Sequence, residues 1–83
     1  MKMNPRVSTV QFKSPYKLIL TFTNNEVKEF DFSSYLDYPV YKALKDETFS
    51  SKARVFNGTV IWDENVDFDP DTLYLESEPL FPA

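Results

Sequence analysis

The chain has no cysteine and no histidine, and its 83 residues include a single glycine. Without cysteine or histidine there is no thiolate nucleophile, no Ser–His or Cys–His catalytic pair and no ordinary zinc site. One glycine is too few for the glycine-rich loops that bind phosphates and dinucleotides. We therefore expect no catalytic residue, no metal site and no cofactor, and so a protein that is not an enzyme.

The missing cysteines also bear on location. Because most secreted domains of this size depend on disulfides, their absence predicts a reducing compartment, the cytoplasm. The N-terminal residues are not followed by the apolar stretch of a signal peptide. No segment approaches the roughly 18 consecutive apolar residues that a membrane span needs, so no membrane association is expected.

Positive charge is scarce and dispersed. The formal net charge is −4, and the lysines and arginines are scattered singly among acidic residues. Binding to nucleic acid requires a clustered positive surface, so direct nucleic-acid binding is not expected. The five tyrosines form no continuous platform in the sequence on which bases could stack. A basic protein is a better match for this composition.

Aromatic residues, in contrast, are abundant. Eight Phe, five Tyr and one Trp make up 17% of the chain. Aromatic side chains bury more area per residue than aliphatic ones, which compensates for a length near the lower limit for a single core. No linker or repeat interrupts the sequence, so we expect one domain over residues 1–83.

The first third of the chain predicts a three-stranded antiparallel meander. Residues 6–12 and 16–23 alternate in part between apolar and polar side chains and are separated by Ser14-Pro15. Asn24-Asn25 then predicts a two-residue hairpin turn, because asparagine tolerates positive φ better than most residues. Residues 26–32 return as the third strand.

A two-residue turn at this position has a consequence for the faces of the sheet. It places Phe22 opposite Val27 on one face and Ile19 opposite Phe30 on the other. Both faces would then carry apolar groups, and the second would be covered by the C-terminal tail, a second copy or a partner. A β-bulge that shifts the register would remove this second apolar face.

The middle of the chain, residues 33–53, has the pattern of short helices. Ser33 and Ser34 are placed to cap a short turn, and Pro39 suits the first position of a helix. Asp46-Glu47-Thr48 interrupts the pattern, and residues 49–53 predict another short helical piece.

The last third predicts a second hairpin and a final helix. Residues 54–62 fold back at Asn57-Gly58, with Val60 and Trp62 on one face. Asp69 caps a helix from Pro70 to about Glu76, and the proline-rich tail cannot be helical. The fold class is therefore α+β, an antiparallel sheet made of the N-terminal meander and the C-terminal hairpin strands and packed with short helices.

The last third is also rich in carboxylates. Asp67, Asp69 and Asp71, followed by Glu78, match the spacing of ligands in a calcium loop. The glycine that such a loop requires is replaced by Thr72, so helix capping by Asp69 is the simpler interpretation. Asp63 and Glu64 have no such structural role in the sequence and form an acidic rim that is a candidate binding surface.

Two groups of residues form a pattern that extends from about Pro5 to Tyr74. The first comprises Leu18-x-Leu20-Thr21-Phe22, Asn24-Asn25-Glu26-Val27, Phe30-Asp31-Phe32 and Tyr35-Leu36. The second, more specific group comprises Gly58-Thr59-Val60-x-Trp62, Asp67 and Pro70-Asp71-Thr72-Leu73-Tyr74. The pattern resembles the small bacterial family catalogued as domain of unknown function 2442. Asn25 stands where that family commonly has glycine, which leaves the turn type open.

The resemblance implies an α+β domain with an antiparallel sheet and no attached catalytic activity. Some relatives carry an appended helix-turn-helix domain. Others are encoded beside a second small protein and have been proposed as the antidote half of toxin–antitoxin pairs. Residues and resemblance together lead us to expect a non-catalytic interaction module that binds a basic, nearby-encoded protein in the manner of an antitoxin, or that forms a homodimer. The alternative is a regulatory or ligand-sensing domain. The candidate partner-binding residues are Asp63, Glu64, Ile19 and Phe30.

Overall fold

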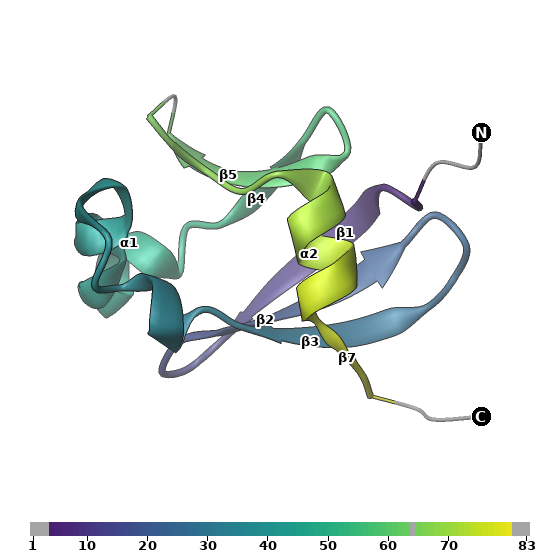
Figure 1. Ribbon diagram of the computed structural model, residues 1–83, viewed down its shortest axis with the longest axis horizontal. Helices are drawn as coiled ribbons and strands as arrows, with labels where there is room; N and C mark the ends of the chain where they lie inside the picture. Colours follow the sequence, from purple (N-terminus) through teal and green to yellow (C-terminus); the bar gives the residue numbers. More distant parts are fainter. Residues whose placement is uncertain (1–3, 64, 81–83) are drawn as a thin grey trace.

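The computed structural model describes residues 4–63 and 65–80, which form two antiparallel sheets and several short helices, an α+β architecture. The first sheet has the order β1-β2-β3-β7, with β1 at Val7–Lys13, β2 at Lys17–Phe22, β3 at Val27–Asp31 and β7 at Glu78–Pro79. The second has the order β4-β5-β6, with β4 at Arg54–Phe56, β5 at Thr59–Asp63 and β6 at Val66–Asp67. Figure 1 shows the two sheets as separate layers, bridged by α2 (Pro70–Glu76).

The predicted meander is present, but its register differs by one residue from the prediction. Thr21 pairs with Val27, and Leu18 pairs with Phe30. The turn has three residues, 23–25, because the N–H of Phe22 donates to the carbonyl of Glu26 across them (2.9 Å). Its last residue, Asn25, has a φ of 71°, as three-residue hairpin turns require at this position.

This one-residue shift decides which face each side chain occupies. Leu18, Leu20, Phe22 and Phe30 share one face and are buried in the core. On the opposite face, Ile19 lies between polar neighbours on β1 and β3. The prediction of two apolar faces is therefore wrong. The register does shift, but the three-residue turn shifts it, and not the β-bulge that was considered as the alternative.

Short helices connect the two sheets at one end of the molecule (Figure 1). They are the 3₁₀ helices η1 (Ser33–Tyr35) and η2 (Pro39–Lys45), and α1 (Glu47–Ser50). Pro39 holds the first position of η2, as predicted. Two predicted details are wrong: the N-cap position of η1 is Phe32, without a side-chain cap, and Asp46 caps α1. The carboxylate of Asp31 accepts the N–H of Ser33 (2.9 Å), and that of Asp46 accepts the N–H of Thr48, so that α1 begins at Glu47 rather than Phe49.

The second hairpin turns at Asn57-Gly58, as predicted. Both residues have positive φ, 51° and 77°, the conformation that matches the twist of a two-residue hairpin. Val60 and Trp62 point into the core, and the indole N–H donates to the carbonyl of Ser50 (2.7 Å). The carbonyl of Gly58 accepts the N–H of Val7 (2.8 Å), which links the second hairpin to β1.

The chain ends along the edge of the first sheet. Asp69 caps α2, its carboxylate accepting the N–H of Thr72 (3.2 Å), as predicted. After α2, β7 pairs with β3, and the N–H of Leu80 donates to the carbonyl of Val27 (3.0 Å). The tail thus extends the sheet instead of covering a face, and its last predicted residues, 81–83, lie outside the described range.

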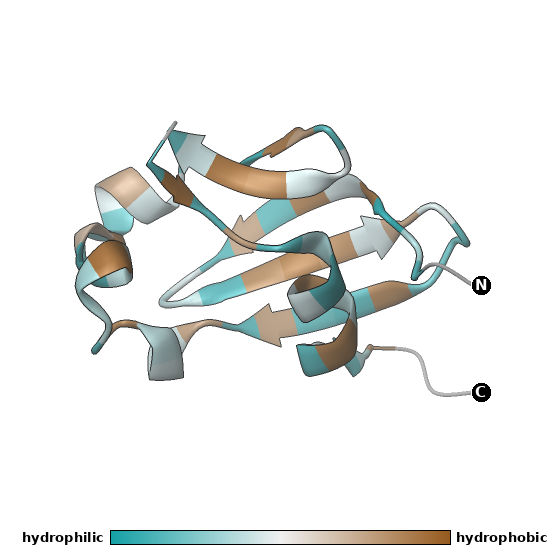
Figure 2. Ribbon diagram, turned by 45° about the horizontal axis from the view of Figure 1, so that its top comes forward, coloured by the Kyte–Doolittle hydropathy of each residue, from teal (hydrophilic) through white to brown (hydrophobic). Residues whose placement is uncertain are grey.

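The core receives side chains from both sheets and from α2. Its buried residues form one cluster, and Figure 2 shows hydrophobic and hydrophilic residues alternating along the strands that enclose it. Aromatic pairs connect the layers: the rings of Phe30 and Phe68 lie 5.1 Å apart, and those of Phe32 and Trp62 lie 5.8 Å apart. None of the helices formed by residues 4–63 and 65–80 is long and apolar enough to cross a membrane.

Candidate functional site

The structure does not bring the predicted site residues together. Phe30 is fully buried, so the expectation that it lies on an exposed sheet face is wrong. Ile19 is half-buried on the outer face of the first sheet, whereas Asp63 ends β5 in the second sheet. Glu64 lies outside the described residues. These residues are therefore parts of separate surfaces.

The acids that were considered as ligands of a calcium loop have different structural roles. Asp67 belongs to β6, Asp69 caps α2, and Asp71 accepts a hydrogen bond from the side-chain amide of Asn4 (3.3 Å) in the first turn of that helix. Glu78 belongs to β7. Within residues 4–63 and 65–80, no group of three or more metal-ligating side chains is arranged to hold a metal ion.

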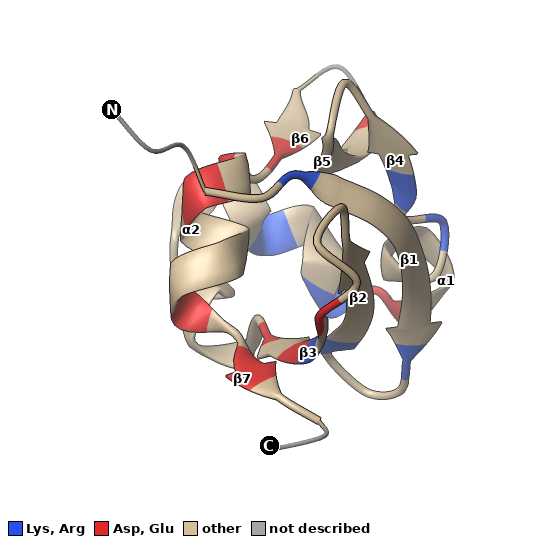
Figure 3. Cartoon of the chain, turned by 90° about the vertical axis from the view of Figure 1, so that its right-hand side faces the viewer, with Lys and Arg blue, Asp and Glu red and all other residues tan. Residues whose placement is uncertain are grey.

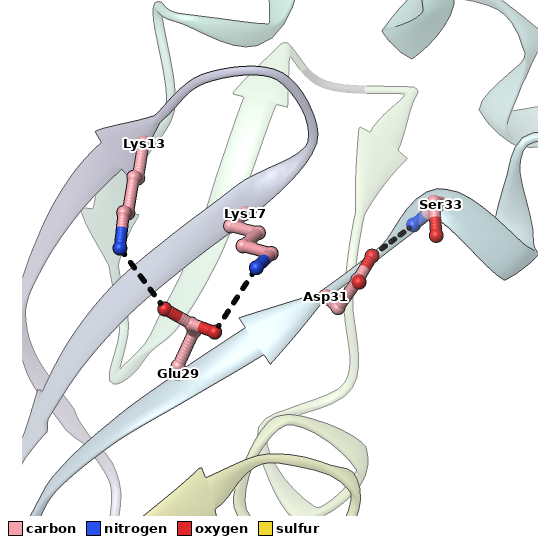
Figure 4. Close-up of polar contacts among 5 residues, drawn as sticks. All are labelled: Lys13, Lys17, Glu29, Asp31 and Ser33. Carbon is pink, nitrogen blue, oxygen red and sulfur yellow. Dashed lines mark hydrogen bonds and ion pairs between the residues drawn. The ribbon is translucent and has the colours of Figure 1, made fainter. Parts of the chain in front are cut away.

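The outer face of the first sheet carries a small network of charges. Glu29 forms ion pairs with Lys13 (3.5 Å) and with Lys17 (3.4 Å), and Figure 4 shows both ion pairs. Asp31 lies next to this network, and the N–H of Ser33 holds the pKa of its carboxyl below the usual value, so it stays charged at neutral pH. The two lysines thus carry one more charge than Glu29, and both ion pairs are made with Glu29 and not with its acidic neighbours.

Three carboxylates gather along the margin formed by β3, α2 and β7, where Figure 3 shows acidic residues on all three elements. We call them the acidic edge: Asp31, Glu76 and Glu78. All three are exposed and line an open hollow of about 280 Å³ together with Lys17 and Glu29. Glu78 pairs directly across strands with Glu29. Local negative charge therefore exceeds positive charge at this margin.

Beside the acidic edge, three tyrosines form what we call the tyrosine surface: Tyr35, Tyr38 and Tyr41. The Tyr35 ring lies 6.2 Å from the Tyr38 ring and 5.9 Å from the Tyr41 ring. Tyr41 stacks on the buried Phe68 with ring centroids 4.5 Å apart, and Tyr38 remains 57% exposed. The rings are thus held by mutual contacts while part of their area faces solvent.

Electrostatics connects these two surfaces. Partial burial raises the pKa of Tyr35, and the negative charge of Glu76 raises it further. Burial likewise raises the pKa of Tyr41, with a further contribution from Asp67. Both phenols therefore stay neutral at physiological pH and can donate hydrogen bonds, and carboxylates lie close enough to influence them.

Sequence reasoning missed the tyrosine surface. Its signal was the spacing of three residues between Tyr35, Tyr38 and Tyr41. The interpretation that the tyrosines form no platform considered only their separation along the chain. The turn between η1 and η2 is what brings them together: the N–H of Tyr38 donates to the carbonyl of Tyr35, and the N–H of Tyr41 donates to the carbonyl of Tyr38.

A third surface covers the outer face of the second sheet. It is an open hollow of about 340 Å³ lined by Arg54, Phe56, Ile61, Asp63 and Asp67. Phe56 is 56% exposed and adds apolar area to this surface. Asp63, predicted from the sequence as a binding residue, lies at this hollow, and its carboxylate accepts the N–H of Asn65 (2.8 Å).

Comparison with known proteins gives a family but no activity. No curated protein and no solved structure matches the chain significantly. The sequence profile of one family, described as protein of unknown function (DUF2442), matches residues 7–79. The match includes every strand of both sheets and all the helices described above, and the family's description assigns no reaction. The chain therefore belongs to the DUF2442 family of proteins of unknown function.

Proposed function

We propose that this protein is a non-catalytic cytoplasmic interaction module that binds a basic protein, in the manner of an antitoxin that neutralises its partner. The observation that carries the proposal is the tyrosine surface adjoining the acidic edge. Protein interfaces are enriched in tyrosine, and a partner's lysine or arginine can pack on a tyrosine ring while pairing with a nearby carboxylate.

The arrangement of the tyrosines favours binding because it is already ordered. Tyr35 contacts the rings of both other tyrosines, and Tyr41 is fixed against Phe68. Ordering a flexible side chain on association costs about 0.5–1.5 kcal/mol, and rings that are held in advance avoid much of that cost. The net charge of −4 further favours the approach of a basic partner.

The test is co-expression of the chain with the product of the neighbouring gene, followed by size exclusion and a measurement of affinity. We expect a complex that weakens as salt is raised, because its charges lie at the surface. Tyr38→Ala should weaken it by about tenfold or more, as the loss of an exposed aromatic contact residue does. Glu76→Lys should weaken it further at low salt.

The matched control is Asp63→Lys, which makes the same change of charge as Glu76→Lys but at the end of β5 instead of the end of α2. Affinity should respond to the substitution at Glu76 and not to the one at Asp63. If no basic protein binds, the proposed function is wrong. If binding depends on Asp63 but not on Glu76 or Tyr38, the acidic edge is the wrong surface.

A further inference from the structure

The outer face of the second sheet has an ordered layout of charge. Because Val60 and Trp62 point into the core, the intervening Ile61 points outward. Ile61 pairs with Arg54 on β4 and with Asp67 on β6. One apolar side chain thus stands between a positive and a negative residue on its two neighbouring strands.

Arg54 and Asp67 do not form an ion pair with each other. They stand two strand spacings apart, on the order of 9–10 Å, with Ile61 between them. The ion pairs formed by the described residues involve Glu29 and the lysines of the first sheet. Both residues are exposed, so each charge is available to a group outside the molecule.

We propose that this face pairs with the same face of a second copy of the chain. A rotation of 180° about an axis parallel to β5 and passing above Ile61 exchanges the β4 side with the β6 side. Arg54 of each copy then faces Asp67 of the other, giving two equivalent charge pairs. The two Ile61 side chains meet at the axis, and such self-complementarity is what a two-fold interface requires.

A second copy fits this face better than a uniformly basic partner does. A partner carrying only positive charge would place a like charge opposite Arg54, which opposes binding. Phe56 adds exposed apolar area on the same face. Asp63 lies near the axis, but the N–H of Asn65 holds its carboxylate in the β5–β6 turn. The dimer face does not include the tyrosine surface, which remains accessible to the basic partner proposed above. The dimer proposal does not depend on that partner.

The size of the face sets the expected affinity. Its six outward residues are Arg54, Phe56, Thr59, Ile61, Asp63 and Asp67. Standard interfaces use roughly 20–30 residues on each side, so this contact should be weak, with a Kd on the order of 10–100 μM. A dimer of this kind is detected by its dependence on concentration.

The experiment is sedimentation equilibrium on the full chain from about 5 μM to about 1 mM, with five samples besides the wild type. Arg54→Glu alone and Asp67→Arg alone should each be monomeric, because each replaces two attractive contacts by two repulsive ones. The double variant, Arg54→Glu with Asp67→Arg, should dimerise again. So should an equimolar mixture of the two single variants, since both contacts are then attractive.

The mixture also controls for folding, because two misfolded variants would not restore a dimer. Glu76→Lys, on the acidic edge, should leave the wild-type dimer unchanged. A wild type that remains monomeric at about 1 mM would overturn the proposal. So would single variants that dimerise like the wild type, or a mixture and a double variant that both stay monomeric.

Discussion

At the scale of single residues, the backbone at position 58 favours glycine over any residue with a side chain. Its φ is 77°, and a Cβ placed on it would lie 2.9 Å from the Cβ of Arg6. The left-handed conformation alone costs a residue with a side chain about 1–2 kcal/mol. The close approach of Arg6 adds to that cost, because the chain segment entering β1 would have to move.

We therefore expect Gly58→Ala to lower the free energy of unfolding by more than about 1–2 kcal/mol, measured by denaturant unfolding. The control is Asn57→Gly, at the other positive-φ position of the same turn, where we expect a change within about 0.5 kcal/mol. Equal effects of the two substitutions would show that the turn tolerates a side chain at Gly58.

A second residue-scale feature is the network around Tyr74. The Tyr74 hydroxyl donates to the carboxylate of Glu26 (2.6 Å), and Lys28 donates to the Tyr74 carbonyl (2.9 Å) with its ammonium 3.8 Å from the ring centre. The hydrogen bond from Tyr74, then that from Asn24 and the charge of Lys28, hold the pKa of Glu26 below 4.5. The same hydrogen bond raises the pKa of Tyr74 above 10.

These shifts predict a dependence of stability on pH. Folding lowers the pKa of Glu26, so the ionised carboxylate stabilises the folded state. This stabilisation is fully present above the unfolded-state pKa of Glu26 and is lost as the pH falls through its folded-state pKa. The contribution of Tyr74, whose pKa is raised, is present below pH 10 and is lost as the pH rises past the folded-state pKa. Tyr74→Phe should move the pKa of Glu26 back toward 4.5, observed by NMR titration of its carboxyl. An unchanged pKa would mean that the hydroxyl does not stabilise the charged carboxylate.

At the scale of elements, the turn between β2 and β3 determines the face of every side chain in the meander. Its three-residue form depends on Asn25 at a φ of 71° and on Asn24, whose side-chain oxygen accepts the N–H of Glu26 (3.1 Å). Glycine is favoured at the left-handed position of such turns because it lacks a Cβ. The two asparagines therefore have different roles in adjacent positions.

This difference predicts opposite effects for one substitution at two sites. Asn25→Gly should raise the free energy of unfolding by a few tenths to about 1 kcal/mol, because it relieves the backbone. Asn24→Gly should lower it by about 0.5–1 kcal/mol, since a side-chain hydrogen bond is lost and the unfolded chain gains freedom. Denaturant unfolding of both variants measures the difference, and a stabilising Asn24→Gly would contradict these roles.

At the scale of the whole molecule, the two sheets share one hydrophobic cluster. Trp62 belongs to the second sheet, yet its ring packs 5.8 Å from Phe32, which follows the first sheet. A probe at Trp62 therefore reports on contacts between the layers. The link between Val7 and Gly58 supports the same coupling through the backbone.

We expect the chain to unfold in a single transition. Trp62 fluorescence and far-UV circular dichroism should give the same midpoint in denaturant, as two-state unfolding of a small domain requires. Phe32→Ala removes a core ring between the layers. It should lower the free energy of unfolding by about 3–5 kcal/mol and move both midpoints together to lower denaturant concentration. Two separate midpoints in the wild type would show that the sheets are independent units.

Much of the local structure could be read from the sequence because it depends on neighbouring residues. Asn57-Gly58 determines a turn through positive φ, and Asp69-Pro70 determines a helix start through capping and a fixed φ. Both were confirmed. The exclusion of histidine- and cysteine-based catalytic groups depends on composition alone, since no fold can supply a missing histidine or cysteine.

Features that depend on distant residues were decided only by the tertiary structure. Phe30 packs against Phe68, which follows the second sheet, and no local pattern encodes this contact. The tyrosine surface and the charge layout around Ile61 likewise combine residues from different elements. The sequence by itself thus determined the turns, the caps and the chemistry that is absent. Long-range packing decided which side chains face solvent together, and binding depends on those exposed faces.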